Sequence, residues 1–214
     1  MIISRGRRYI FVHIPKTGGT SMALALEARA MKDDILIGDT PKALRRRNRA
    51  KQLKARGRIW KHSTLADIEG VVTREELSAF LIFTLVRNPW DRLVSYYHWL
   101  TSQEFDHPAV ALARRRDFSG FLNDPMTRAA VSANGYDSYM RDAAGALHDP
   151  VFVRIEALEA DLAPVRAHLG FDLMPGRENT SDRDRDWRVY YSDKDAELVA
   201  ELCSADIERF GYQF

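Results

Sequence analysis

The sequence predicts an α/β protein with an open, mainly parallel central sheet flanked by helices. Two short, nearly continuous apolar runs, RYIFVHI (8–14) and FLIFTLV (80–86), are typical of strands buried on both faces. VFVRI (151–155) is a further candidate strand, and GRIWKH (57–62) is a shorter fourth one. Helical patterns separate these runs, and alternation of strands and helices favours parallel pairing with right-handed crossovers. Such sheets bind ligands at the carboxyl ends of their strands, where the polar motifs of this chain are found.

The bulk composition indicates one compact, soluble domain over residues 1–214. The 214 residues contain no repeat and no Pro/Gly/Ser-rich linker. No window reaches the roughly 18 apolar residues of a membrane span, and the start of the chain lacks a secretion signal. With Cys203 as the one cysteine, an intramolecular disulfide or a cysteine-cluster metal site is excluded. We therefore expect a cytoplasmic location, no membrane partner, and a structural role for Cys203 in an apolar helix.

Basic residues gather in one segment of the chain. Residues 41–61 hold ten Lys or Arg and no Asp or Glu, which leaves 22 of the 32 basic residues against 30 acidic residues elsewhere. A basic segment on an otherwise acidic protein points to an anionic partner, although a solvated basic helix without a ligand has the same pattern. We expect the segment to be a mobile lid or a docking surface for an anionic acceptor.

The stretch FVHIPKTGGTSM (11–22) predicts an anion-binding loop between a strand and a helix. Two adjacent glycines, Gly18 and Gly19, permit a backbone turn that directs several N–H groups at one anion. The N-terminus of the following helix adds the positive end of its dipole, and Lys16 adds a full charge. Hydroxyl donors come from Thr17, Thr20 and Ser21. The simpler alternative is a glycine turn without a ligand.

The order of residues in this loop differs from that of an ATP-binding P-loop. In a Walker A motif the lysine follows the glycines, and a hydroxyl next to it holds Mg²⁺. Here Lys16 precedes the glycines, and the second strong strand ends in Arg87, a cation, where a metal-binding Asp would be needed. A Mg²⁺-dependent nucleotide kinase or similar phosphoryl transferase is thus a less favoured alternative.

The stretch RNPWDRLVSYYHWL (87–100) supplies a second candidate anion site. Asn88 suits the N-cap of a helix, and Arg87 ends the preceding strand. Ser95 lies two helical turns from Asn88 on the same face, away from the apolar stripe. Arg87 and Ser95 could together hold an anion. Alternatively, Arg87 pairs with a nearby carboxylate and Ser95 is ordinary helix surface.

The stretches HIPKTGGTS and RNPWDRLVSYYHW resemble the two signature elements of the sulfotransferases that use 3′-phosphoadenosine 5′-phosphosulfate (PAPS). The chain is most similar to the carbohydrate type, which includes heparan sulfate 2-O-sulfotransferase, and would be a compact soluble member without that group's membrane anchor. The resemblance extends to FVRIEALEADLAPVRAHLGF (152–171) and to the C-terminal ADIERFGYQF. It implies a P-loop NTPase-like fold and a metal-free, in-line transfer of a sulfuryl group to a hydroxyl or, less favoured, an amine. The product would be adenosine 3′,5′-bisphosphate.

The resemblance also implies roles for individual residues. Lys16 matches the lysine beside the leaving oxygen, and Arg87 with Ser95 matches the pair that binds the 3′-phosphate. His62 is comparable in position to the catalytic base of carbohydrate-type members, with a surface or structural histidine as the alternative. Asn179 matches a region that adjoins the nucleotide. The phosphosulfate loop corresponds to Lys16, Thr17, Gly18, Gly19, Thr20 and Ser21.

The sequence does not identify the acceptor molecule. A small molecule or a glycan is expected, with segment 41–61 favouring an anionic one. A nucleic-acid-binding protein that uses this segment is an alternative, and the two intact anion motifs weigh against it. No pattern of histidines and carboxylates predicts a metal site, and the oligomeric state is left open.

Overall fold

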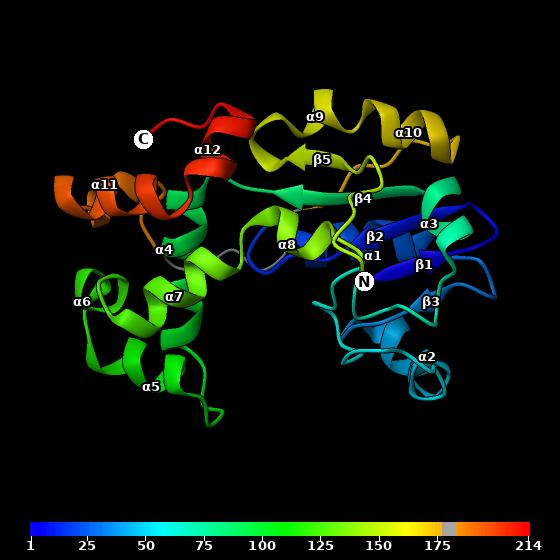
Figure 1. Cartoon of the computed structure of the whole chain (residues 1–214), viewed down its shortest axis with the longest axis horizontal. Helices are drawn as coiled ribbons and strands as arrows, with labels where there is room; N and C mark the ends of the chain where they lie inside the picture. Colours follow the sequence, from blue (N-terminus) through cyan, green and yellow to red (C-terminus); the bar gives the residue numbers. More distant parts are fainter. Residues whose placement is uncertain (177–182) are drawn as a thin grey trace. The chain divides into compact units, whose positions relative to one another are not determined.

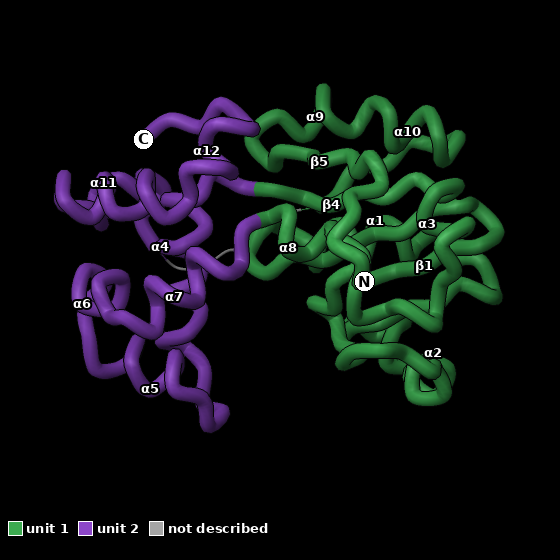
Figure 2. Tube along the Cα trace, viewed as in Figure 1, with its two compact units in different colours: residues 1–86, 136–178 green, residues 87–135, 179–214 purple. Residues whose placement is uncertain are grey.

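The computed structural model describes residues 1–176 and 183–214, and the chain divides into two compact units (Figure 2). Unit 1 consists of residues 1–86 and 136–178, and unit 2 of residues 87–135 and 179–214. The single domain expected from the sequence stays a prediction. No helix in the described part of the chain is long and apolar enough to cross a membrane.

Unit 1 is built on a five-stranded sheet with the order β3-β1-β2-β4-β5 (Figure 1). The pairs β2–β4 and β4–β5 are parallel, whereas β1 runs antiparallel to both β2 and β3. The predicted α/β class and open sheet are confirmed, with an antiparallel strand inserted near one edge. The strands are β1 (Ile2–Ser4), β2 (Tyr9–Val12), β3 (Ile35–Leu36), β4 (Leu81–Val86) and β5 (Val151–Arg154).

Helices cover this sheet because both of its faces are apolar. On one face Phe11 and Phe83 belong to a buried core that includes Met22 of α1 and Val165 of α10. On the other face the side chain of Ile10 is equally buried. The helices of unit 1 are α1 (Gly19–Ala28), α2 (Pro41–Lys51), α3 (Arg74–Ala79), α8 (Tyr136–Met140), α9 (Leu158–Asp161) and α10 (Ala163–Leu169), with a 3₁₀ turn η1 (Ile155–Ala157).

Three of the four strands predicted from the sequence are present, and the fourth is wrong. Residues 57–62 form no strand and instead bend into a turn at 61–62, where the buried hydroxyl of Ser63 accepts a hydrogen bond from the Trp60 N–H (2.9 Å) and folds the chain back. The same hydroxyl lies 2.9 Å from the Arg58 carbonyl oxygen. The two strands that the sequence did not predict, β1 and β3, contain only three and two residues. Runs this short carry no recognisable periodicity.

Unit 2 is helical and contains the predicted helix after the second strong strand. Asn88 caps α4 by accepting a hydrogen bond from the Trp90 N–H (3.1 Å), and Leu93 and Leu100 are buried in the apolar stripe of this helix. The C-terminal stretch from Ser192 to Gly211 forms two helices with a break at Cys203. The elements are α4 (Pro89–Thr101), α5 (Pro108–Arg115), α6 (Phe118–Leu122), α7 (Pro125–Ala133), η2 (Trp187–Tyr190), α11 (Asp193–Leu202) and α12 (Ser204–Phe210).

The two glycines that begin α1 are required for different reasons. Gly18 has φ of 81°, in the left-handed region that residues with a β-carbon rarely adopt. Gly19 is helical, but a β-carbon there would lie 2.0 Å from the Cδ2 atom of His13. The first glycine therefore permits a turn, and the second permits the helix backbone to lie against an imidazole ring.

We expect Gly19→Ala to destabilise the protein by about 1–3 kcal/mol, the usual cost of forcing a group into a packed site. Because the obstacle is the His13 ring, most of this cost should vanish in a His13→Ala background. Gly18→Ala is the matched control: its cost comes from the backbone angle and should be the same in both backgrounds. Urea denaturation of these four variants and of the two parent proteins measures the coupling, and an equal cost of Gly19→Ala in both backgrounds would contradict this account.

Candidate functional site

The glycine loop lies at the carboxyl end of β2 in unit 1. β2 ends at Val12, the chain turns at residues 15–18, and α1 begins at Gly19. Lys16 adopts a φ of 66°, a left-handed conformation that is uncommon for a residue with a side chain. Backbone strain of this kind costs on the order of 1–3 kcal/mol and is concentrated at functional sites. The strained residue is the lysine that the family resemblance predicts to lie beside the leaving oxygen.

The N-terminus of α1 is not capped by a side chain. Its N-cap is Gly18, which makes no side-chain hydrogen bond, and the first turn contains no acidic residue. By contrast, Thr40 caps α2 and Asn88 caps α4 through their side chains. The first turn of α1 instead presents backbone N–H groups and the positive end of the helix dipole, the usual requirements for binding an anion. Thr20 and Ser21 lie in this first turn.

Thr17 differs from the other hydroxyl residues of the loop. Its side chain is fully buried, and its hydroxyl donates a hydrogen bond to the carbonyl oxygen of Ile14 (2.9 Å). The hydroxyl proton is thus engaged in closing the turn. Thr17 can reach an anion only through its backbone N–H.

His62 packs beside this loop, within the same unit. Its Nδ1 atom lies 2.7 Å from the carbonyl oxygen of His13, and the two imidazole rings meet edge to face with centroids 4.6 Å apart. A carbonyl oxygen can only accept a hydrogen bond, so Nδ1 of His62 carries the proton. In the neutral ring, Nε2 then has a lone pair and can accept a proton.

Burial keeps this histidine pair neutral. Burial lowers the pKa of His62 to about 4, against a smaller raising effect of its hydrogen bond to the His13 carbonyl. The pKa of His13 is also lowered well below its ordinary value, first by burial. His13 is packed in the core, with its ring stacked on Phe11. Trp60 closes the other side of His62 at a ring distance of 5.0 Å.

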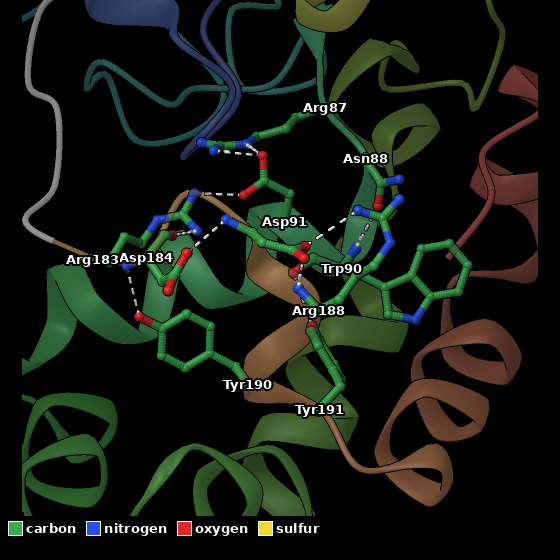
Figure 3. A network of polar contacts seen from close by, with 10 residues as sticks. Arg87, Asn88, Trp90, Asp91, Arg183, Asp184, Arg188, Tyr190 and Tyr191 are labelled. Atoms are coloured by element: carbon green, nitrogen blue, oxygen red, sulfur yellow. Dashed lines mark hydrogen bonds and ion pairs between the residues drawn. The ribbon is translucent and has the colours of Figure 1, made fainter.

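In unit 2, Arg87 is held by a carboxylate at the start of α4 (Figure 3). Its Nε and Nη2 atoms both lie 2.7 Å from one carboxylate oxygen of Asp91, four residues further on. The other oxygen of Asp91 pairs with Arg183, whose side chain is only 8% exposed. The alternative that Arg87 pairs with a carboxylate is therefore present in the structure, and it fixes the orientation of the guanidinium.

The remaining predicted residues have different outcomes. Ser95 is buried on α4, with 5% of its surface exposed, so it is not ordinary helix surface. Asn179 lies outside the described residues. The charged stretch after it is partly self-paired, since Arg188 lies 3.3 Å from Asp186. Within residues 1–176 and 183–214 no group of three or more His, Cys, Asp or Glu side chains could hold a metal ion.

Sequence reasoning did not assign Asp91 as the partner of Arg87, although the spacing of four residues on a helix is a known signal for such a pair. It also did not assign the contact between His13 and His62. Forty-nine residues separate the two histidines, and their contact depends on the turn at 57–62 that the sequence mispredicted.

The chain was compared with known protein families, curated proteins and solved structures. The model of a family described as the sulfotransferase family matches residues 1–213. No curated protein matches. Among solved structures, the crystal structure of the mouse sulfotransferase SULT7A1 complexed with PAP superposes with a TM-score of 0.52 at 17% sequence identity, covering 95% of this chain and 86% of that one. At this identity the structural match supports the fold, whereas the family match covers nearly the whole chain. The chain therefore belongs to the sulfotransferase family.

Proposed function

We propose that this protein transfers a sulfuryl group from PAPS to a hydroxyl group of an acceptor, leaving adenosine 3′,5′-bisphosphate. The observation that carries the proposal is the packing of a neutral histidine, His62, beside an uncapped, lysine-containing anion loop in one unit. Family membership supports the reaction class. The structure of the mouse sulfotransferase SULT7A1 with PAP supports a nucleotide of this type.

The loop residues would hold the 5′-phosphosulfate. Backbone N–H groups from Thr17 to Ser21 and the hydroxyls of Thr20 and Ser21 would bind the non-bridging oxygens. Lys16 would lie beside the oxygen that bridges phosphorus and sulfur. Charge develops on that oxygen as the bond to sulfur breaks, and a fixed cation stabilises it without a metal ion.

The proton balance of the reaction requires a base, and the proposed base is His62. The acceptor oxygen forms a bond to sulfur, and the sulfur–oxygen bond to the phosphate breaks with its electron pair on the departing phosphate. The acceptor proton moves to Nε2 of His62, which has the free lone pair. The His13 carbonyl holds the ring in the required tautomer.

Arg87 and Ser95 would bind the 3′-phosphate, with Asn179 near the nucleotide. The bond between Arg87 and Asp91 orients the guanidinium before the ligand arrives. We further propose a carbohydrate acceptor and a reducing compartment such as the cytoplasm, the latter supported by the single cysteine.

The proposal is tested by ligand-induced thermal stabilisation and by turnover. Adenosine 3′,5′-bisphosphate should raise the melting temperature, whereas AMP, which lacks the 3′-phosphate, should raise it much less. PAPS turnover should persist in EDTA. Stabilisation by ATP and Mg²⁺ alone, with no effect of the bisphosphate, would instead indicate a phosphoryl transferase.

Replacing Arg87 by Ala should weaken binding of adenosine 3′,5′-bisphosphate by about 30-fold or more, because a charge-assisted contact of roughly 2 kcal/mol or more is lost. Binding of AMP should change little. Isothermal titration calorimetry measures both. Arg188→Ala is the control. Arg188 is also an arginine of unit 2 that pairs with a carboxylate, that of Asp186, and it lies over the Trp187 ring. Its replacement should leave the affinity for both nucleotides unchanged. An equal loss for both nucleotides in Arg87→Ala would refute a 3′-phosphate contact.

His62 should remain neutral, with its proton on Nδ1, from pH 5.5 to 8. Because its pKa is lowered to about 4, the base form is present throughout this range and is lost only as the pH falls toward 4. Nitrogen NMR of the imidazole ring measures the protonation and the tautomer. A midpoint between pH 6 and 7 would contradict the lowered pKa, and a proton on Nε2 would exclude the assigned base. His62→Gln should lower kcat by about 10²- to 10⁴-fold with little change in bisphosphate affinity.

A further inference from the structure

A cavity of about 490 Å³ lies in unit 1 between α2, the end of β3 and the turn at 59–61. This volume suits a small organic ligand. One part of its wall is apolar and is made by Leu36, Ile37, Ala43 and Leu53. Another part is polar and includes Arg47, Lys51 and Lys61. The cavity is thus shaped by the basic segment 41–61 and by the residues that immediately precede His62.

The cavity is lined by the carboxyl end of β3, which lies at the same edge of the sheet as the anion loop. β1 is antiparallel to both β2 and β3, so β2 and β3 run in the same direction and their carboxyl ends coincide. Ile2 of β1 is aligned with Leu36 on one side and with Phe11 on the other. Leu36 and Phe11 are therefore two strand spacings apart, or about 10 Å. The end of β3, which lines the cavity, therefore lies about 10 Å from the strand that leads into the anion loop two residues after Phe11.

Half of the basic face of α2 is used to hold the helix in place. Lys42, Arg46 and Arg49, at helical spacings of four and three, donate hydrogen bonds to backbone carbonyl oxygens of residues 27–34. The buried hydroxyl of Thr40 caps α2 and also donates to the carboxylate of Glu27 (2.6 Å). These bonds anchor α2 against the segment that follows α1, which favours a fixed docking surface over a mobile lid.

The next face of α2 lines the cavity. Ala43, Arg47 and Ala50 repeat the same spacing one residue on, about 100° around the helix, and Lys51 follows Arg47 by one turn. In the described part of the chain the side chains of Arg47 and Lys51 have no ion-pair or hydrogen-bond partner. Two cations therefore face the cavity without a carboxylate to neutralise them. The one acid in its wall, Asp39, pairs with Lys61 (2.6 Å).

Trp60 links the cavity to the base. It lines the cavity with 39% of its surface exposed, and its ring contacts that of His62 at 5.0 Å. Arg58 lies over the Trp60 ring at 4.9 Å, which fixes the ring without burying it. An exposed indole next to apolar and cationic groups is suited to the apolar face of a sugar or aromatic ring.

We propose that this cavity is the acceptor site and that it takes a hydroxylated acidic glycoside, whose ring lies against Trp60 and whose carboxylate pairs with Arg47 and Lys51. The inference rests on the proposed function, because the neighbouring His62 would take the proton of the acceptor hydroxyl. Nucleic acid is a poorer occupant, since six of the ten basic side chains of segment 41–61 already have partners within the protein.

The probes are phenyl β-D-glucuronide and phenyl β-D-glucoside, which differ in a single carboxylate. Their affinities are measured by titration calorimetry without nucleotide, so that the result does not depend on PAPS chemistry. The glucuronide should bind at least tenfold more tightly than the glucoside. In the double variant Arg47→Glu/Lys51→Glu its affinity should fall at least tenfold. The control Arg45→Glu/Lys54→Glu makes the same change in net charge at exposed positions of the segment that do not line the cavity.

A second variant, Ala50→Trp, fills the cavity at a half-buried position and should abolish binding of both probes while leaving the stability of the protein largely intact. Equal affinities for the two glycosides, or an equal loss in both charge-reversal variants, would overturn the inference. Binding of adenosine 3′,5′-bisphosphate is measured in parallel. If the glucuronide binds as expected but adenosine 3′,5′-bisphosphate does not, the proposed sulfuryl transfer from PAPS is refuted. The glycoside-binding site in the cavity is supported in that case.

Discussion

The contact between the Gly19 backbone and the His13 ring determines how the anion loop and the base are arranged. His13 follows β2 directly, and its carbonyl oxygen accepts the Nδ1 proton of His62. Its ring meets both Gly19 and His62. One residue thus positions the start of α1 on one side and the imidazole of the base on the other. A side chain at position 19 would clash with the His13 ring and displace the start of α1 from it. The positions of the anion loop and of the His62 ring are therefore coupled through His13.

The two ends of α1 differ in how the charges of the helix dipole are compensated. Its N-terminus has no side-chain cap and no acid, which leaves the positive end of the dipole for an anionic ligand. Carbonyl oxygens in its last turn and the following loop receive Lys42, Arg46 and Arg49 of α2. Cations near the negative end of a helix dipole are stabilising. The basic segment therefore stabilises the C-terminal end of the helix whose N-terminus follows the anion loop.

Much of the fold could be predicted from the sequence because it rests on local patterns, whereas the roles of the candidate residues rest on the family resemblance and stay predictions. β2, β4, β5 and the cap of α4 follow from apolar runs and from Asn88-Pro89. β1 and β3 could not be predicted, since two or three residues form strands only when a neighbour supplies the pairing. The contact of His62 with His13 also depends on tertiary packing, through a turn that Ser63 closes. The cavity under α2 requires three separate segments and has no signal in any one of them.

The link from Arg87 through Asp91 to Arg183 shows why an ion pair is compatible with binding a phosphate. Two arginines next to each other would repel, and the carboxylate between them compensates one of the two charges and fixes both guanidinium groups. Together the three side chains keep a net positive charge. Because the pairs are largely shielded from solvent, a guanidinium held in this way loses little conformational freedom when an anion arrives. A free surface arginine would have to be ordered at the moment of binding, so the carboxylate contributes to affinity by organising the cation in advance.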